Sequence, residues 1–576
     1  MPWPSRAVLP GRRRAGEAKG DEVVRRRGIR KITAMVRRGG RPGRQAEYEA
    51  GLPTQAGGLL EPSRWPAYEK DDLERLPIEP DLEKNLRRLE AIFGHDPDFA
   101  TRRFRIGGRV AAAALFLEGM VERPLLTENL LKPLVQYRPE PGARLTPAFL
   151  AESVITMPVQ RKVADLHAVC DHVLDGCVVL LVDGEREGLA LKAVGYEKRS
   201  PEEPMTEAVV RGPREGFIES LATSVTLLRR RLKTPNLVLE NLVLGRVAHT
   251  QVVITYLRGL AAPELVGEVK KRLARIDVDG VLESNYIEEL IRDHPLSPFP
   301  QVIVTERPDR VAAHLLDGRV AILMENTPFA LVVPGEFVAY MQSPEDYYHH
   351  TVLGIFIRLL RWGAFAISLL LPSIYVAVTT FHQEMIPTRL LLNIVGAREG
   401  VPLPAVVEAL VMEVAFEILR EAGVRLPRAV GQAVSIVGAL VIGEAAVTAG
   451  VVSPLMVIIV ALTGIASFLT PSFDLAIAIR ILRFPMMLLA ASLGLFGVVT
   501  GILAILIHLA GLRSFGVPYL AGLTPFHPQD WKDVIVRLPM WMMRRRPREL
   551  AKENRERMAP DLKPHPPGGR GRRGAD

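Results

Sequence analysis

The C-terminal half of this 576-residue chain is far more apolar than the rest, and this contrast limits the folds that the chain can adopt. Residues 352–512 consist mainly of Leu, Ile, Val, Ala and Gly, whereas the residues before them carry the charge of an ordinary globular protein. A bilayer span needs about 20 consecutive apolar residues. Segments that meet or approach this length lie at residues 362–381, twice within residues 429–473, and at residues 484–512. We therefore expect an all-α polytopic membrane domain after a soluble part.

A fifth, weaker candidate span lies at residues 404–419. The stretch that contains most of it, AVVEALVMEVAFEILREAGVRLPR at residues 405–428, carries acids among its apolar residues. At about 100° per residue in a helix, Glu413, Glu417 and Arg420 fall on one narrow face, where Glu417 can pair with Arg420. Glu408 points nearly opposite. Two interpretations remain open. Either the helix lies at an interface with its acids in water, or it faces a helix bundle in which Glu413, Glu417 and Arg420 serve gating or coupling.

Arginines beside the apolar segments indicate how the chain crosses a membrane. Cytoplasmic loops are enriched in Lys and Arg, which puts the loops near Arg425 and Arg480 inside and the uncharged turn AAVTAGVVSP at residues 445–454 outside. Both termini are then expected in the cytoplasm, with one segment re-entrant or interfacial. The stretch WKDVIVRLPMWMMRRRPR at residues 531–548 mixes Trp, Met and Arg, and it predicts a helix that lies on the inner leaflet.

The residues before the apolar half contain an internal repeat. LFLEGM at residues 115–120 recurs as TYLRGL at residues 255–260, and HVLDGCVVLLVDG at residues 172–184 recurs as HLLDGRVAILMEN at residues 314–326. The two pairs are offset by 140 and 142 residues, so they indicate a duplicated unit. Strand-like and helix-like stretches follow one another in each copy. The soluble N-terminal part is therefore predicted to be α/β, with duplicated small subdomains.

These patterns divide the chain into six parts. We expect a basic disordered tail at residues 1–80, α/β subdomain 1 at 81–200, a linker and helix at 201–240, α/β subdomain 2 at 241–345, a membrane domain of four to six helical segments at 350–515, and a basic cytoplasmic tail with an interfacial helix at 516–576. Residues 1–45 hold 14 Lys or Arg against three acids, a composition that cannot support a core. Met35 offers an alternative start of translation.

The linker RGPREGFIESLATSVTLLRRRLKTPNL at residues 211–237 combines a turn with a charged helix. Its glycines and proline predict the turn, and a helix is expected over residues 217–232. Such a turn before a helix can bind phosphate, but no P-loop or dinucleotide fingerprint is present. A helix that packs between subdomains or subunits is the favoured interpretation. Its expected assembly contacts are Arg211, Arg214, Glu215 and Glu219.

The sequence carries no recognisable catalytic or metal-binding set. Cys170 and Cys177 lie near His167 and His172, but this spacing fits no compact zinc module. We find no serine-hydrolase, metalloprotease or kinase signature, so no enzyme activity, cofactor or metal ion is expected. Much of the net charge of +9 comes from the tails, where it suits membrane lipid better than nucleic acid.

Several motifs resemble the A subunits of spore germinant receptors, the GerA family. The motifs are VVRGPREGFIESL, MQSPEDYY, TTFHQEMIPT, LRSFGVPYL, SPFPQVIVTERPDRVAAHLLDGRVAIL and EILREAGVRLPRAVGQAVSIVGALVIGEAAV. The resemblance covers residues from about 85 to about 550. The paralogous stage V sporulation protein AF, which amplifies germination, and a secondary transporter remain alternatives. The QSPEDYY and FHQEMIPT blocks favour the receptor A subunit.

The resemblance implies partners and a location. The family's A subunit works with a transporter-like B subunit and a lipoprotein C subunit in the inner membrane of a bacterial endospore. It would be a multi-pass protein with a cytoplasmic N-terminal domain. It would also form a homo-oligomer, a ring whose membrane part conducts ions when a nutrient is sensed.

If such a ring forms, Glu444 is the main candidate for the ion path. Fifteen uncharged residues separate it from Arg428. They span about 22 Å of helix, less than the hydrocarbon core of about 30 Å, so Glu444 would fall inside the apolar slab. A ring of acids there selects cations. The other pore candidates are Ser435, Ile436, Val437 and Leu440, the last three as an apolar gate. The alternative places Glu444 in solvent at the external end of its helix.

Overall fold

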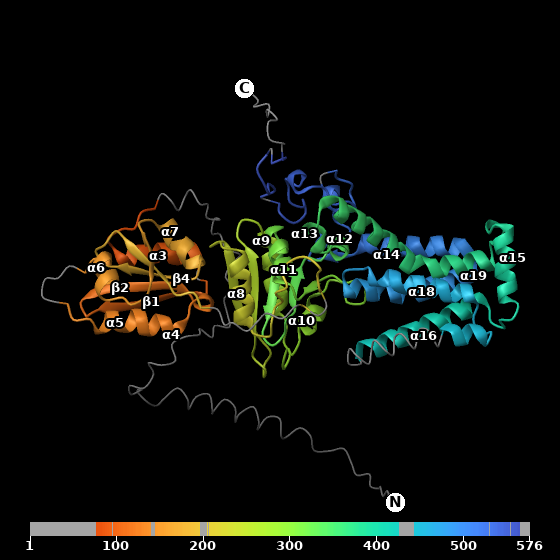
Figure 1. Ribbon diagram of the computed structural model, residues 1–576, viewed down its shortest axis with the longest axis horizontal. Helices are drawn as coiled ribbons and strands as arrows, with labels where there is room; N and C mark the ends of the chain where they lie inside the picture. Colours follow the sequence, from red (N-terminus) through yellow and green to blue (C-terminus); the bar gives the residue numbers. More distant parts are fainter. Residues whose placement is uncertain are drawn as a thin grey trace, which may run out of the picture. The chain divides into compact units, whose positions relative to one another are not determined.

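The computed structural model describes most of the chain after residue 75 (Figure 1). The described residues are 76–94, 96–139, 145–195, 204, 207–425, 443–528, 530–552, 554–560 and 562–564. Two predicted features lie outside them. One is the basic tail before residue 76, and the other is the set of pore candidates Ser435, Ile436, Val437 and Leu440.

The first subdomain is a five-stranded antiparallel sheet with helices on both faces (Figure 1). Its strands follow the order β1 (Phe99–Ile106), β2 (Val110–Leu117), β4 (Cys177–Val182), β5 (Gly188–Lys192) and β3 (Val159–Val163). One face carries α3 (Leu82–Phe93) and α7 (Leu166–Leu174); the other carries α4 (Arg123–Leu126), α5 (Lys132–Gln136) and α6 (Pro147–Ser153). Because side chains alternate along a strand, Leu115 of β2 faces the α3 core and Ala114 faces the α6 core.

The second subdomain repeats this architecture. Its strands follow the order β6 (Leu237–Leu244), β7 (Thr250–Leu257), β9 (Val320–Met324), β10 (Ala330–Val333) and β8 (Ile303–Thr305). One face carries α8 (Leu221–Arg231) and α11 (Pro308–Leu316); the other carries α9 (Pro263–Ala274) and α10 (Ser284–Ile291). The predicted α/β N-terminal part is confirmed, and the two sheets share one strand order.

Outer strands were the part of each sheet that the sequence pattern did not predict. β1 reads FATRRFRI, with Arg102 and Arg103 exposed. It borders only β2, so it needs no continuous apolar run. The repeat was detected through the inner strands because these are buried on both faces.

A buried ion cluster joins the two subdomains through α8. Arg229 of α8 is fully buried and pairs with Asp96, and its Nε lies 3.8 Å from Asp98 Oδ2. Thr226 of the same helix donates to the Gly119 carbonyl at 3.1 Å. Because Asp96, Asp98 and Gly119 belong to the first subdomain, α8 packs against both subdomains, as the sequence predicted for a linker helix.

The apolar half folds into long helices. They are α14 (Thr351–Thr380), α15 (Thr388–Arg398), α16 (Ala405–Arg425), α18 (Pro454–Phe468) and α19 (Phe473–Gly511), and α14 packs against α16, α18 and α19. Among the described residues, α14 and α19 are the helices long and apolar enough to cross a membrane, and α18 is a shorter apolar helix. The sequence predicted four such segments. α19 contains a kink at Gly494. Its φ of 62° lies in the left-handed region, which glycine adopts without strain because it has no Cβ atom.

The C-terminal tail differs from its prediction. In place of an interfacial helix, the described residues after 529 contain the short 3-10 turns η4 (Asp530–Asp533) and η5 (Met540–Met542). Pro539 and Pro547 explain the difference, because proline lacks the N–H that a helix interior needs. The tail packs on the second subdomain instead, where Arg546 Nε donates to the Leu316 carbonyl at 2.8 Å.

The ion cluster at α8 predicts pH-dependent contact between the subdomains. Burial raises the pKa of Asp98 to about 6, and burial lowers the pKa of Arg229 to about 9, so Arg229 stays charged near neutral pH. The ordinary Asp pKa is about 3.9. The contribution of Asp98 to the free energy of unfolding is therefore complete below about pH 4 and is lost as the pH rises through 6. The total loss is at most about 3 kcal/mol.

We expect Asp98→Asn to abolish this loss. Hydrogen exchange of the α8 amides in the intact protein, corrected for intrinsic rates, should slow in the variant at pH 7.5 and match the wild type at about pH 4.5. Asp175→Asn is the matched control, since Asp175 pairs with Lys233 at 2.7 Å with both side chains about half exposed. Equal pH profiles for Asp98→Asn and the wild type would refute the assignment.

Candidate functional site

The segment between the second subdomain and α14 folds around one buried carboxylate. The motif MQSPEDYY forms the end of α12 (Phe337–Met341) and the short α13 (Glu345–Tyr348), and α14 begins three residues later. Pro344 stands at the start of α13 with two acids in its first turn, which suits a helix N-terminus. This turn places the Asp346 side chain, 1% exposed, against the first turns of α14.

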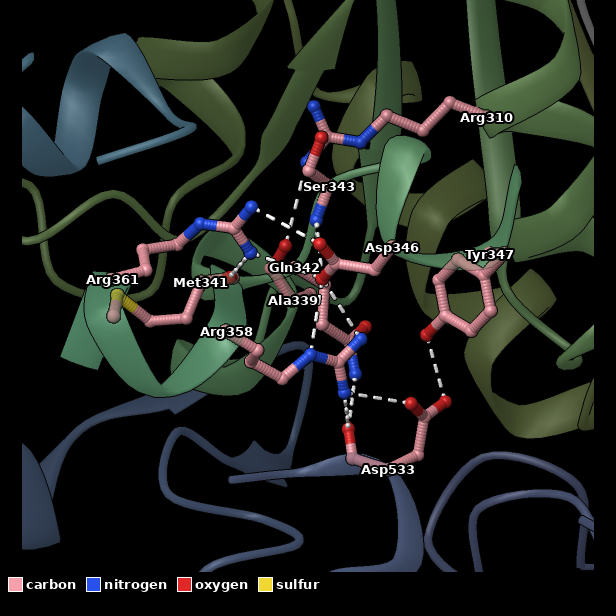
Figure 2. Close-up of polar contacts among 10 residues, drawn as sticks. All are labelled: Arg310, Ala339, Met341, Gln342, Ser343, Asp346, Tyr347, Arg358, Arg361 and Asp533. Carbon is pink, nitrogen blue, oxygen red and sulfur yellow. Dashed lines mark hydrogen bonds and ion pairs between the residues drawn. The ribbon is translucent and has the colours of Figure 1, made fainter. Parts of the chain in front are cut away.

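Two arginines of α14 converge on Asp346 (Figure 2). Arg358 donates from Nε to Asp346 Oδ2 at 3.0 Å. Arg361 donates to both carboxylate oxygens, at 3.0 and 3.1 Å, and also to the Met341 carbonyl at 2.8 Å. The Arg358 side chain is fully buried and that of Arg361 is 6% exposed. Both charges are thus taken from water and depend on Asp346.

A second carboxylate completes the cluster from the C-terminal tail. Asp533 accepts from Arg358 Nη1 at 2.8 Å and from the Tyr347 hydroxyl at 2.8 Å (Figure 2). Its backbone carbonyl accepts from Gln342 at 2.7 Å. Burial raises the pKa of Tyr347 well above its usual value, so the phenol keeps the proton that it donates. We call Asp346, Tyr347, Arg358, Arg361 and Asp533 the junction cluster.

The junction cluster balances two cations with two carboxylates and joins three parts of the chain. α13 follows the second subdomain directly, α14 is a candidate membrane span, and Asp533 belongs to the tail. Arg310 of α11 adds a contact with the Ala339 carbonyl at 3.4 Å. Such a cluster has no nucleophile poised by a base. It holds parts of the chain in place, because separating α13 from α14 leaves Asp346 and Arg361 buried without each other, and removing the tail leaves two arginines on one carboxylate.

The α16 acids face other helices. Glu413 is fully buried and accepts from Arg483 Nη1 of α19, and Arg483 also donates to the Ser368 carbonyl of α14 at 2.8 Å. Glu417 pairs with Arg480 of α19 at 2.7 Å. These contacts match the interpretation of a helix that faces a bundle, and they argue against acids in water for Glu413.

The predicted pair within α16 is confirmed. Arg420 lies 3.5 Å from Glu417 and also donates to Ser467 of α18 at 2.6 Å. For Glu408 the sequence predicted only that it points away from Glu413 and Glu417, and it did not predict the partners of this carboxylate. Glu408 is fully buried, where it accepts from Arg398 of α15 at 2.9 Å and from the Ser453 hydroxyl at 2.9 Å.

The remaining predicted site residues are not members of the junction cluster. Glu444 is the second residue of a short described helical stretch, residues 443–448, and is exposed. Glu215 pairs with Arg231 of α8 at 2.7 Å, and the Glu219 carbonyl accepts from Asn326 at 2.9 Å. Arg211 and Arg214 are exposed. Glu215 therefore lies beside α8, and the role of the four linker residues as assembly contacts stays a prediction.

Sequence reasoning missed the junction cluster. Arg358 and Arg361 directly precede the apolar segment at residues 362–381, three residues apart and thus on one helix face. Asp346 was noted within a motif. The signal that could have joined them is the pair of arginines at the start of a span, because charges there need a buried partner. Nothing in the sequence pointed to Asp533, which is far away along the chain.

Comparison with known proteins gives consistent matches over most of the chain. The family model of the Bacillus/Clostridium GerA spore germination protein matches residues 87–549. Spore germination protein KA of Bacillus subtilis is 47% identical over 498 residues, covering 86% of this chain and 91% of the relative. An uncharacterized membrane protein of the same organism is 45% identical over 491 residues, covering 85% and 95%.

Two further matches concern Bacillus cereus and Bacillus megaterium. Spore germination protein GerLA of B. cereus is 38% identical over 476 residues, covering 82% of this chain and 96% of the relative. The crystal structure of the N-terminal domain of the A subunit of a B. megaterium spore germinant receptor is 32% identical. The match covers 45% of this chain and 97% of the chain in that crystal structure, with a TM-score of 0.37.

The junction cluster predicts a large effect for one isosteric change. Asp346→Asn leaves Arg358 and Arg361 buried without their shared carboxylate, a loss that costs about 3–5 kcal/mol in comparable pairs. We expect a lowered melting temperature of the purified protein and faster hydrogen exchange in α13 and the first turns of α14. Glu345→Gln is the neighbouring control, because the Glu345 carboxylate accepts from the Val210 amide at the surface and is not a member of the junction cluster. A wild-type melting temperature for Asp346→Asn would refute the role of this carboxylate.

Proposed function

The chain belongs to the GerA family of spore germination proteins, and we propose that it is the A subunit of a nutrient-responsive germination receptor. It acts with a transporter-like B subunit and a lipoprotein C subunit in the inner membrane of the spore. Its helical part spans that membrane several times, and its two sheet subdomains lie on the cytoplasmic side. The support is the family match over residues 87–549 together with two helices of spanning length and composition.

The observation that carries a receptor mechanism is the junction cluster. Asp346 holds both Arg358 and Arg361, so the second subdomain and α14 cannot shift against each other without exposing or unpairing a charge. A movement in the sheet subdomains therefore reaches the helices at their first turns. We propose that this link transmits the state of the receptor between the two parts.

Within the helices, α16 is the proposed gating or coupling element. Its charged side chains tie it to three neighbours: to α19 through Glu413 and Glu417, to α15 through Glu408, and to α18 through Arg420. Glu413 Oε1 is buried and, within the described part of the chain, has no hydrogen-bond partner. If both carboxylate oxygens of Glu413 had hydrogen-bond partners, they would hold α16 in one position. An oxygen without a partner can gain a hydrogen bond in a second position of the helix, and we propose that α16 adopts such a position.

The ion path is proposed to form in a homo-oligomeric ring. Glu444 is exposed on the single chain, which leaves it free to line a symmetry axis as an acidic ring. Ser435, Ile436, Val437 and Leu440 precede it along the chain, and the apolar members of this set would close the path by dewetting. The chain thus acts as a channel subunit, without catalysis or a cofactor.

Cation flux through liposomes that contain the three subunits tests this proposal. Glu444→Gln should cut nutrient-triggered cation flux about tenfold or change its selectivity while assembly stays normal. Leu440→Ala should leak without nutrient. Glu421→Gln is the control, since Glu421 pairs with Arg425 on the exposed side of α16.

Two results would contradict the proposal. Wild-type flux and gating in both Glu444→Gln and Leu440→Ala would place the path elsewhere. Flux that saturates with nutrient and requires its co-transport would identify a secondary transporter instead.

A further inference from the structure

A small cavity lies where α14 ends and α15 packs beside it. It has a volume of about 440 Å³. Its polar lining comes from Thr379, Gln383, Arg398 and Glu399, and its apolar lining includes Leu391 and Ile394. No role described above uses this cavity, although one of its lining residues, Arg398, is also the partner of Glu408.

The cavity lies about one membrane thickness from the junction cluster. Arg361, paired with Asp346, marks the soluble end of α14. Thr379 follows 18 residues later on the same helix, which is about 27 Å of helix, close to the hydrocarbon core of about 30 Å. With Arg361 at one interface, the cavity lies at the level of the lipid headgroups of the opposite leaflet.

The lining offers one cation beside one anion. Arg398 donates from Nη2 to Glu408 at 2.9 Å, and its side chain remains 23% exposed. Its Nε is buried and has no hydrogen-bond partner in the part of the chain that the structure describes. Glu399 follows directly along the chain and has no ion pair among the described residues. A ligand with an acidic group and an ammonium group matches both charges.

The surface of α15 indicates where such a ligand comes from. Leu390, Leu392 and Val395 are 49%, 66% and 56% exposed, and Ile394 is the buried residue of this helix. An 11-residue helix with this much uncovered apolar surface, at headgroup level, lies against acyl chains. The cavity therefore borders lipid, and a lipid headgroup reaches it with its chains already in place along α15.

We propose that this cavity binds the headgroup of a phosphatidylethanolamine-type lipid. The phosphate oxygens accept hydrogen bonds from the Arg398 guanidinium, and the ammonium group donates to the Glu399 carboxylate. The acyl chains lie along Leu391 and Val395. The assignment uses the proposed function only for its membrane setting, and it adds a ligand that acts on the same helices.

Headgroup binding competes with Glu408. Arg398 is one guanidinium, and a phosphate in the cavity draws it from the Glu408 carboxylate, which then keeps the Ser453 amide and hydroxyl. Since Glu408 stands in the first turn of α16, the lipid loosens the contact between α15 and α16. Linkage requires the reverse effect too, so removing the Glu408 charge strengthens headgroup binding.

Lipid retention by the full-length protein tests the assignment. The protein is reconstituted in nanodiscs of phosphatidylglycerol with and without phosphatidylethanolamine, and native mass spectrometry then counts the lipids that each chain retains. Wild type should retain one phosphatidylethanolamine in preference to phosphatidylglycerol. Glu399→Gln should weaken this retention about tenfold, the equivalent of one charge-assisted contact. Glu408→Gln should strengthen it, a gain that a merely structural role would not produce.

Glu384→Gln is the matched control, because Glu384 is exposed in the turn just after α14 and does not line the cavity. Equal retention by Glu399→Gln and Glu384→Gln overturns the proposal. Displacement of the lipid by free phosphoethanolamine or glycine also overturns it in favour of a soluble zwitterion. Lipid retention is measured without nutrient and without cation flux. A negative flux assay therefore does not contradict lipid binding, and a negative retention assay does not contradict the proposed channel.

Discussion

The pairing of Asp346 with Arg358 and Arg361 is the interaction on which the rest of the structure depends. The second subdomain and the apolar helices share one hydrophobic cluster, in which Phe337 packs against Trp362 and Phe365, but apolar packing is non-directional and specific polar contacts fix how the two parts meet. Here one carboxylate holds two guanidinium groups from consecutive turns of α14, and Asp533 from the tail neutralises the second charge. Buried pairs of this kind add little net stability, but breaking one is costly, which makes them suited to fixing geometry. The first turns of α14 are thereby held to the second subdomain.

The same design continues along the helices. Glu408, Glu413 and Glu417 of α16 each pair with an arginine on another helix. In lipid, such charges tolerate few arrangements, since each must keep a partner or reach water. The helices are therefore expected to move between discrete pairings rather than continuously. Arg398 lies at the far end of this series and contacts both Glu408 and the cavity beside α15, so that a headgroup there can bias which pairing is adopted.

The sequence predicted those features that follow from local pattern. The inner strands β2, β4, β7 and β9 were found because their apolar runs recur at nearly equal offsets, whereas β1 was missed because an edge strand such as FATRRFRI carries arginines. The pair of Glu417 with Arg420 was predicted, since both lie on one helix face. Pairs between helices, such as Glu413 with Arg483, depend on packing that no local pattern encodes. The tail was misjudged because its aromatic and basic composition outweighed Pro539 and Pro547.

Hydrogen exchange in the intact receptor, with and without nutrient, tests the central claim most directly. If the junction cluster couples the two parts, nutrient should change the protection of α13 and of the first turns of α14 together, at concentrations that also start cation flux. The exposed ion pair of Arg246 with Asp277, at a turn of the second subdomain, should show no such change. Flux that starts while α13 and α14 keep their protection, or a change in one without the other, would contradict the account.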